Sequence, residues 1–262
     1  MTGEFLTQAP LWIAAIALFA AMVVFRTLGA SAHRKLARFA DARESSSNDE
    51  GFILSSVLGL LSLLLAFTFS LALDRHEQRR VLIVSEANAL GTAADRFQLL
   101  DEPQRTQLTA LLRQYAGTRL KVGFADSFSD RFRAEQQSAQ LASGLTAATI
   151  LTVRPMRAAS VGVSVLDSVS SLVDLAAQRK AAADARLPSR VLGLMALYCV
   201  VSAGMLGYTL ALTGSRHRVA SYLLFSLFAF AFVTILDLDR PRSGAIRVPQ
   251  QALVDAFKAL PS

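Results

Sequence analysis

The chain has 262 residues, of which 53% are hydrophobic and only 18% carry a charge, and its formal net charge is +7. Soluble globular domains carry roughly 25% charged residues, so this deficit favours a membrane protein. The basic residues are spread along the chain in nothing longer than pairs, which argues against nucleic acid as a partner. The single cysteine, Cys199, excludes an intramolecular disulfide framework.

Four apolar runs, at about 11–30, 52–73, 191–212 and 219–236, are long enough to cross a bilayer, which takes roughly 20 residues. The amino-terminal MTGEFLTQAPLW has no Lys or Arg, unlike a secretory signal peptide, so we expect the first run to be retained as a span. The sequence thus predicts an all-α, polytopic membrane protein with a helical extramembrane domain.

The spans divide the chain into four parts. Residues 1–73 hold the first two spans and a short polar loop, which contains ARESSSNDEG, and residues 74–190 form the extramembrane domain. Residues 191–240 form a hairpin of the third and fourth spans, because only TGSRHR links them, and residues 241–262 are a carboxy-terminal tail. With four spans, both termini and the extramembrane domain lie on one side.

The extramembrane domain is predicted to be helical nearly throughout. Asp101-Glu102-Pro103 is a helix start signal, and a second helix is expected to begin near Asp126. Arg154-Pro155 predicts a break. The first of these helices has an apolar face that comprises Leu108, Leu111, Leu112 and Tyr115. The second helix carries Phe128 and Phe132 one turn apart. A third helical stripe comprises Leu166, Val169, Leu172, Val173 and Ala176. The strand-like alternation of VGVSV is too short to predict a strand.

The second span runs into a charge cluster without a helix breaker. Between Phe52 and Leu100 only Gly59 and Gly91 weaken a helix. We therefore predict one helix of roughly 70 Å that leaves the membrane and continues into the extramembrane domain. The charged exit marks the membrane surface and comprises Asp74, Arg75, His76, Glu77, Arg79 and Arg80.

One face of this helix carries small or polar residues at steps of three and four. We call it the small-residue stripe; it comprises Ser55, Gly59, Ser62, Ala66, Ser70 and Leu73. Small residues let membrane helices pack closely, and this interpretation is favoured by the stripe alone. A pore lining is the second interpretation, because hydroxyls that face a lumen can replace the hydration of an ion. On the third span, Ala203, Gly207 and Ala211 are interpreted as a packing face.

A second charge cluster, at the end of the fourth span, comprises Asp237, Asp239, Arg240 and Arg242. Carboxylates at a membrane boundary are costly unless they are paired or hydrated. Local ion pairing that fixes the helix end, with Arg75, Arg79 or Arg80 as partners, is the favoured interpretation. A charged vestibule that attracts ions is the alternative.

Catalytic and metal chemistry find no support in the sequence. His33, His76 and His217 are far apart and have no second ligand at helical spacing, so we expect no metal site. The chain has no GxSxG, P-loop or HExxH motif. We therefore expect neither an enzyme nor a bound cofactor.

Four segments together resemble the bacterial bestrophin-like membrane proteins, a four-span family of unassigned function. They are the second span, its exit LALDRHEQRR, the segment SEANALGTA and the carboxy-terminal DLDRPRSGAIRVPQ. A more distant resemblance is to the bestrophins, homopentameric anion channels whose second helix lines a central pore and continues into a cytoplasmic domain. Two features of bestrophins are missing: their tryptophan-rich run is replaced by His76-Glu77-Gln78, and their calcium-binding acidic cluster has no convincing counterpart.

The resemblance implies a homo-oligomer of about five subunits that conducts small inorganic anions across a bacterial inner membrane. It makes packing and pore about equally favoured for the stripe. The main hypothesis is an oligomeric anion channel lined by the second span; the alternative is a non-conducting scaffold or sensor whose helical domain binds a partner protein. Basic residues in the two short loops favour a periplasmic domain, whereas the basic flanks of the domain and the resemblance favour the cytoplasm, which we expect.

Overall fold

The computed structural model describes residues 10–36, 47–125, 127–156, 160–214, 217–240 and 244–261, and every regular element in these ranges is helical. The helices are α2 (Leu11–Leu36), α3 (Ser47–Phe97), α4 (Gln104–Phe124), α5 (Phe128–Val153), the 3₁₀ turn η1 (Arg154–Met156), α6 (Ser160–Asp184), α7 (Ser189–Leu212), α8 (Arg218–Asp239) and α9 (Gln251–Ala259). The predicted all-α class is confirmed. Residues 37–46, which hold the first half of the predicted polar tract ARESSSNDEG, and the positions Asp126 and Arg242 lie outside the described residues. The second half of that tract, residues 47–51, is the first part of α3 and not a loop, so the prediction is wrong there.

Four segments are helical, long and apolar enough to cross a membrane, as predicted. The second of them belongs to α3, a single helix of 51 residues. It contains no Pro, so no backbone donor is lost and nothing interrupts the helix between the apolar span and the charges that follow. The prediction of one continuous helix is confirmed, and this helix ends at Phe97, three residues before the predicted end.

The chain divides into two compact units. Unit 1 comprises residues 1–74 and 186–246, and unit 2 comprises residues 75–185 and 247–262. Helix α3 contributes its first part to unit 1 and its last part to unit 2. VGVSV lies within α6 and is helical, so its short alternation did not produce a strand.

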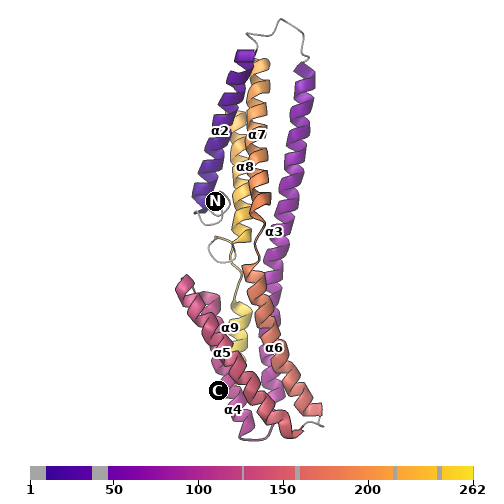
Figure 1. The fold of residues 1–262 in the computed structure, drawn as a ribbon, viewed down its shortest axis with the longest axis vertical. Helices are drawn as coiled ribbons and strands as arrows, with labels where there is room; N and C mark the ends of the chain where they lie inside the picture. Colours follow the sequence, from indigo (N-terminus) through magenta and orange to yellow (C-terminus); the bar gives the residue numbers. More distant parts are fainter. Residues whose placement is uncertain are drawn as a thin grey trace. The chain divides into compact units, whose positions relative to one another are not determined.

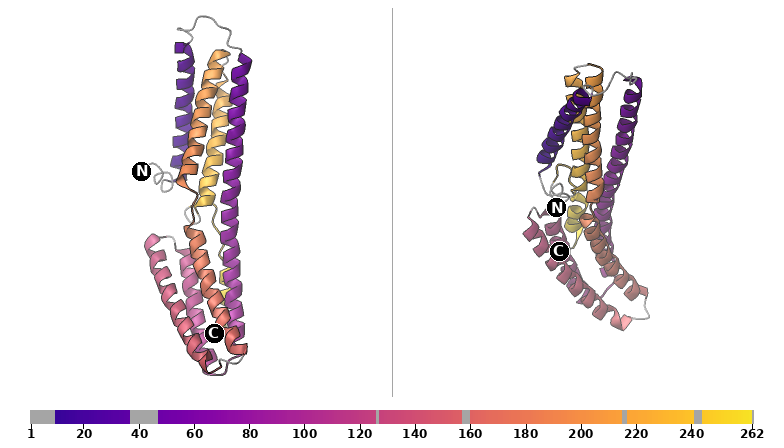
Figure 2. Two further views of the ribbon diagram at one scale, coloured as in Figure 1. Left: turned by 45° about the vertical axis from the view of Figure 1, so that its right-hand side comes forward. Right: turned by 45° about the horizontal axis from the view of Figure 1, so that its top comes forward.

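Unit 1 is built around α2, which packs against both α7 and α8, more extensively than these two pack against each other (Figures 1 and 2). Backbones of α2 and α7 approach closely, because a Cβ at Gly207 would overlap the carbonyl oxygen of Arg26. Ala203, one turn earlier, is buried. Small residues therefore form the α2–α7 contact, as predicted for this face of the third span.

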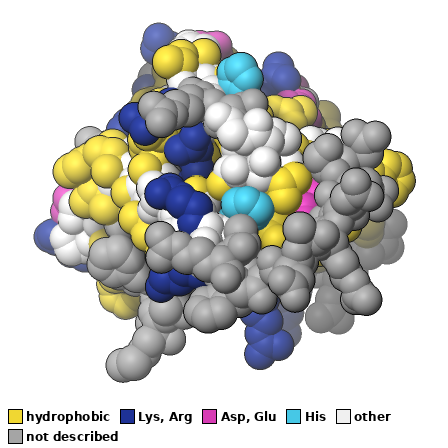
Figure 3. Space-filling view, turned by 90° about the horizontal axis from the view of Figure 1, so that it is seen from above, with side chains coloured by type: hydrophobic (Ala, Val, Ile, Leu, Met, Phe, Trp, Pro, Cys, Tyr) yellow, Lys and Arg dark blue, Asp and Glu magenta, His cyan; other side chains and the backbone are white. Residues whose placement is uncertain are grey.

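Basic and histidine side chains gather at the end of unit 1 where α2 ends (Figure 3). The last turn of α2 carries His33, Arg34 and Lys35. Cations in the last turn of a helix interact favourably with its carbonyl end. The ring of His33 also meets Tyr208 edge-on, with centroids 5.1 Å apart.

In unit 2, α4, α5 and α6 follow one another as neighbouring helices, and α9 packs against α4. The predicted face of α4 is mostly buried there. That of α6 is buried at Val169 and Leu172 and half-buried at its other three positions. One core holds all these helices together; its fully buried members include Leu90, Phe97, Leu108, Leu112, Tyr115, Leu145, Val169, Leu172 and Leu253. Ser127 caps the start of α5: its hydroxyl accepts a hydrogen bond from the backbone N–H of Ser129.

Candidate functional site

The membrane-spanning part of α3 has three different faces. At about 100° per residue, they are separated by roughly a third of a turn each. One face is buried in unit 1 and includes Leu54, Leu61, Thr68 and Ala72. A second is apolar and exposed, and includes Ile53, Leu60, Phe67 and Leu71. The third is the small-residue stripe, and all six of its residues (Ser55, Gly59, Ser62, Ala66, Ser70, Leu73) are exposed.

Packing within one copy of the chain therefore does not explain the stripe, because no described element covers it. Its hydroxyls are satisfied within their own helix: Ser55 donates to the carbonyl oxygen of Gly51, and Ser62 to that of Leu58, both at 2.9 Å. Such bonds leave the oxygen lone pairs of the two hydroxyls available on the helix surface. The stripe thus presents small groups and hydroxyl oxygens outward.

The charged exit follows the stripe on the same helix, and its members differ in environment. Asp74, Glu77 and Arg80 are exposed, whereas Arg75 and His76 are half-buried. Glu77 and Arg80 form an exposed ion pair one turn apart, with 3.1 Å between the Glu77 Oε1 and Arg80 Nη1 atoms. Such a pair adds little stability.

Arg79 has a structural position that the sequence analysis did not predict. Its side chain is buried, with 3% of its surface exposed. The guanidinium group donates to the carbonyl oxygens of Ala182 and Ala185, at 3.0 and 2.8 Å. These carbonyls end α6 and have no partner within that helix. Arg79 thus caps α6, unlike the exposed Asp74, Glu77 and Arg80 of the charged exit.

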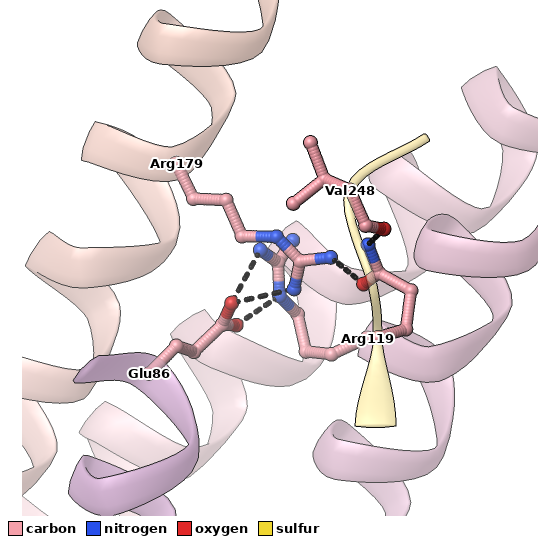
Figure 4. A network of polar contacts seen from close by, with 5 residues as sticks. Glu86, Arg119, Arg179 and Val248 are labelled. Atoms are coloured by element: carbon pink, nitrogen blue, oxygen red, sulfur yellow. Dashed lines mark hydrogen bonds and ion pairs between the residues drawn. The ribbon is translucent and has the colours of Figure 1, made fainter. Parts of the chain in front are cut away.

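A buried polar network lies further along α3 (Figure 4). The Glu86 carboxylate accepts hydrogen bonds from two guanidinium groups, those of Arg119 on α4 and Arg179 on α6. Glu86 is fully buried, and both arginine side chains are 7% exposed. Arg179 also donates to the side chain of Gln250, whose amide in turn donates to the carbonyl oxygen of Val248.

The ion pairs favour the charged forms of Glu86 and Arg119. They outweigh burial, which alone would raise the pKa of Glu86, and hold that pKa below its usual value, whereas burial lowers the pKa of Arg179. Burial alone would lower the pKa of Arg119, but the carboxylate of Glu86 outweighs that effect and raises the pKa above its usual value. Burial raises the pKa of neighbouring Tyr115 to about 12, so its hydroxyl stays neutral. The network joins α3, α4, α6 and the segment that leads into α9, which makes it a fixed anchor of unit 2 rather than a site open to solvent.

The carboxy-terminal motif DLDRPRSGAIRVPQ holds two buried carboxylates. Asp237 accepts from the backbone N–H groups of Ala245 and Ile246, at 2.8 and 3.2 Å. Asp239 accepts from the N–H of Leu187, at 2.8 Å. A Cβ at Gly244 would overlap the Asp237 carboxylate, so the turn requires glycine at this position.

These contacts correct part of the prediction for this cluster. Asp237 and Asp239 are 7% and 3% exposed and bind backbone amides, so neither carboxylate faces a solvent-filled vestibule in this chain. Arg240 is also buried. These backbone contacts fix the end of α8, which agrees with the structural interpretation of the cluster.

The carboxy-terminal motif DLDRPRSGAIRVPQ and the long helix α3 are two features on which the sequence resembles a known family. A model of the bestrophin-like domain matches residues 11–253. The chain belongs to the bestrophin-like family. No curated protein matches this bestrophin-like chain.

Solved structures of a bacterial bestrophin homologue from Klebsiella pneumoniae share its fold. One matches with a TM-score of 0.63 and 12% identity, over 94% of this chain and 99% of that chain. A point mutant of the homologue matches with a TM-score of 0.65 and 11% identity, over 96% and 99% of the two chains. At these identities the likeness concerns the fold alone.

Sequence reasoning did not predict that Glu86, within the segment SEANALGTA, has two buried arginine partners. A signal was present, since Arg119 continues the apolar face of Leu108, Leu112 and Tyr115 at helical spacing, and Arg179 continues that of Val169 and Leu172. A charge that continues a buried face predicts a paired buried group. Among the described residues no cluster of His, Cys, Asp or Glu is suited to hold a metal ion.

Proposed function

We propose that this bestrophin-like chain forms an oligomeric ion channel and that α3 lines its pore with the small-residue stripe. The observation that supports this most is the exposure of the whole stripe on a face of α3 distinct from the buried one. Repetition of the chain around an axis would bring one stripe from each subunit to a common lumen.

The chemistry of the two exposed faces of α3 favours this orientation. The face with Ile53, Leu60, Phe67 and Leu71 presents large apolar side chains and suits lipid or a neighbouring subunit. Hydroxyl groups gain nothing from acyl chains, and they can coordinate ions or water in a lumen. Exposed serines therefore fit a hydrated pore better than a lipid contact.

The charges of the exit do not indicate whether anions or cations pass, because its accessible acidic and basic residues balance. Anion conduction is therefore proposed from the resemblance to bestrophins. With Arg79 used as a cap, the accessible exit carries Asp74 and Glu77 against Arg75 and Arg80. Planar-bilayer recordings of the purified protein in a KCl gradient test this proposal. A reversal potential near that of chloride supports it. A reversal potential near that of potassium would contradict the anion assignment, and no current at any voltage would favour the non-conducting scaffold or sensor.

The subunit number is proposed from the same resemblance to be about five. Native mass spectrometry of the protein extracted in mild detergent measures it directly. A closed ring is required for a lumen lined by α3. A monomer or dimer in several detergents would leave the stripe without a lumen and would overturn the pore.

We further propose that the protein resides in a bacterial inner membrane with unit 2 in the cytoplasm. The basic side chains in the last turn of α2 argue for the reverse orientation. Carboxy-terminal fusions separate the two orientations, because the tail of the chain belongs to unit 2. A fluorescent GFP fusion supports the cytoplasmic side, and an active alkaline phosphatase fusion would contradict it.

A further inference from the structure

Aromatic side chains gather without cover where α4 ends and α5 begins. Phe124, Phe128 and Phe132, which we call the aromatic patch, are 60%, 74% and 52% exposed. The rings of Phe128 and Phe132 stack with their centroids 6.4 Å apart, and the guanidinium group of Arg131 lies 5.3 Å from the centroid of the Phe128 ring. Three large exposed rings within nine residues are unfavourable in water and indicate a contact surface.

Contacts inside unit 2 locate the patch along its length. The ammonium group of Lys180 lies 3.4 Å from the carboxylate of Glu135, so these two positions on α6 and α5 are level. Arg79 binds the end of α6 at Ala182 and Ala185. The end of α6 is therefore level with the charged exit of α3.

The start of α5 reaches the same level. Phe128 precedes Glu135 by seven residues, or roughly 10 Å of helix, and Ala185 follows Lys180 by about 7.5 Å in the same direction. The direction is the same because α5 and α6 are consecutive antiparallel helices joined through η1. Phe128 therefore lies at about the same level along unit 2 as the charged exit of α3, and Phe132 lies one turn further from that level.

We propose that the aromatic patch enters the headgroup layer of the bilayer and anchors unit 2 to the membrane surface. The inference uses the position of the charged exit at that surface and holds whether or not the chain conducts ions. Aromatic rings with nearby cations favour the interface, where the ring reaches the acyl boundary and the cation meets lipid phosphate. Arg131 beside Phe128 and the exposed Lys121 supply such cations, although Arg131 also lies 3.5 Å from the Glu135 carboxylate. Arg133 pairs with the exposed Asp130 carboxylate at 3.0 Å.

Fluorescence quenching by brominated lipids tests this contact. Trp12 is the only tryptophan in the chain, so a Trp12→Phe background allows one reporter at a time. The Phe128→Trp variant of the full chain is reconstituted in vesicles of phosphatidylcholine and phosphatidylglycerol, with or without bromine on the upper acyl chain. The control is Leu99→Trp, since Leu99 is 60% exposed in the turn between α3 and α4, at the other end of unit 2.

We expect blue-shifted emission and strong quenching for Phe128→Trp, weaker quenching for Phe132→Trp, and none for Leu99→Trp. Water-like emission without quenching at position 128 would overturn the proposal. Blue-shifted emission that bromine does not quench would also overturn it, because protein from a neighbouring subunit or another partner would then cover the patch. If the Trp12→Phe background fails to fold, Trp12 is retained and its own quenching in the parent chain is subtracted.

Discussion

Glu86 and Arg179 lie 93 residues apart in the sequence and form a buried ion pair, with 2.7 Å between the Glu86 Oε2 and Arg179 Nη1 atoms. Arg119 binds the same carboxylate from α4. Two arginines thus share one acid in the interior of unit 2. Removing the acid leaves both cations buried without their counter-charge, which costs much more than the intact pair contributes.

Glu86→Gln is therefore expected to destabilise unit 2 by about 3–5 kcal/mol. Thermal unfolding of the detergent-solubilised protein measures the change as a large fall in Tm. Glu77→Gln is the matched control, because Glu77 lies on the same helix in an exposed ion pair with Arg80. The control is expected to cost about 1 kcal/mol or less. Equal shifts in Tm for the two variants would contradict the importance of the network.

Asp237 and Gly244 should be coupled, because a Cβ at position 244 would overlap the Asp237 carboxylate. Gly244→Ala is expected to cost about 1–3 kcal/mol through overpacking. In an Asp237→Ala background the same change meets no carboxylate, so its additional cost should be clearly smaller. Tm values of the parent, the two single variants and the double variant give the coupling. Strict additivity would show that the overlap is not what requires glycine.

Leu253 provides a test of the place of the carboxy-terminal segment. Its side chain is fully buried in the core of unit 2, and Arg113 on α4 donates to the carbonyl oxygen of Leu260 nearby at 2.8 Å. Leu253→Ala is expected to cost about 2–5 kcal/mol. Gln251→Ala, two residues earlier on an exposed side of α9, is the control and should leave Tm almost unchanged. Tolerance of Leu253→Ala would mean that the segment detaches from unit 2 freely.

Elements that depend on local pattern were predictable here. The continuity of α3 followed from the absence of Pro, and the faces of α4 and α6 followed from helical periodicity. The partners of Glu86 were not, because Arg119 and Arg179 come from two other helices and only tertiary folding brings them together. Asp237 binds amides eight and nine residues later, a contact that depends on the path of the turn and not on a repeating pattern.

The different roles of neighbouring charged residues next to a span also could not be predicted from the sequence. Arg79 and Arg80 are adjacent and chemically identical, yet Arg79 is buried at the end of α6 and Arg80 is exposed beside Glu77. Helical geometry turns consecutive side chains by about 100°, so one neighbour meets α6 and the other meets solvent. The charged exit, which the sequence presents as a single cluster, therefore contains both a helix cap, Arg79, and surface charges such as Arg80.

The measurement that tests the pore most directly is chloride flux in vesicles containing the Ser62→Trp variant. Ser62 is on the small-residue stripe, and Leu60→Trp places the same bulk on the exposed apolar face of α3 two residues earlier. We expect Ser62→Trp to abolish flux while native mass spectrometry shows an unchanged assembly, and we expect Leu60→Trp to retain flux. Normal flux through an intact assembly of the Ser62→Trp variant would contradict the assignment of the stripe to the pore.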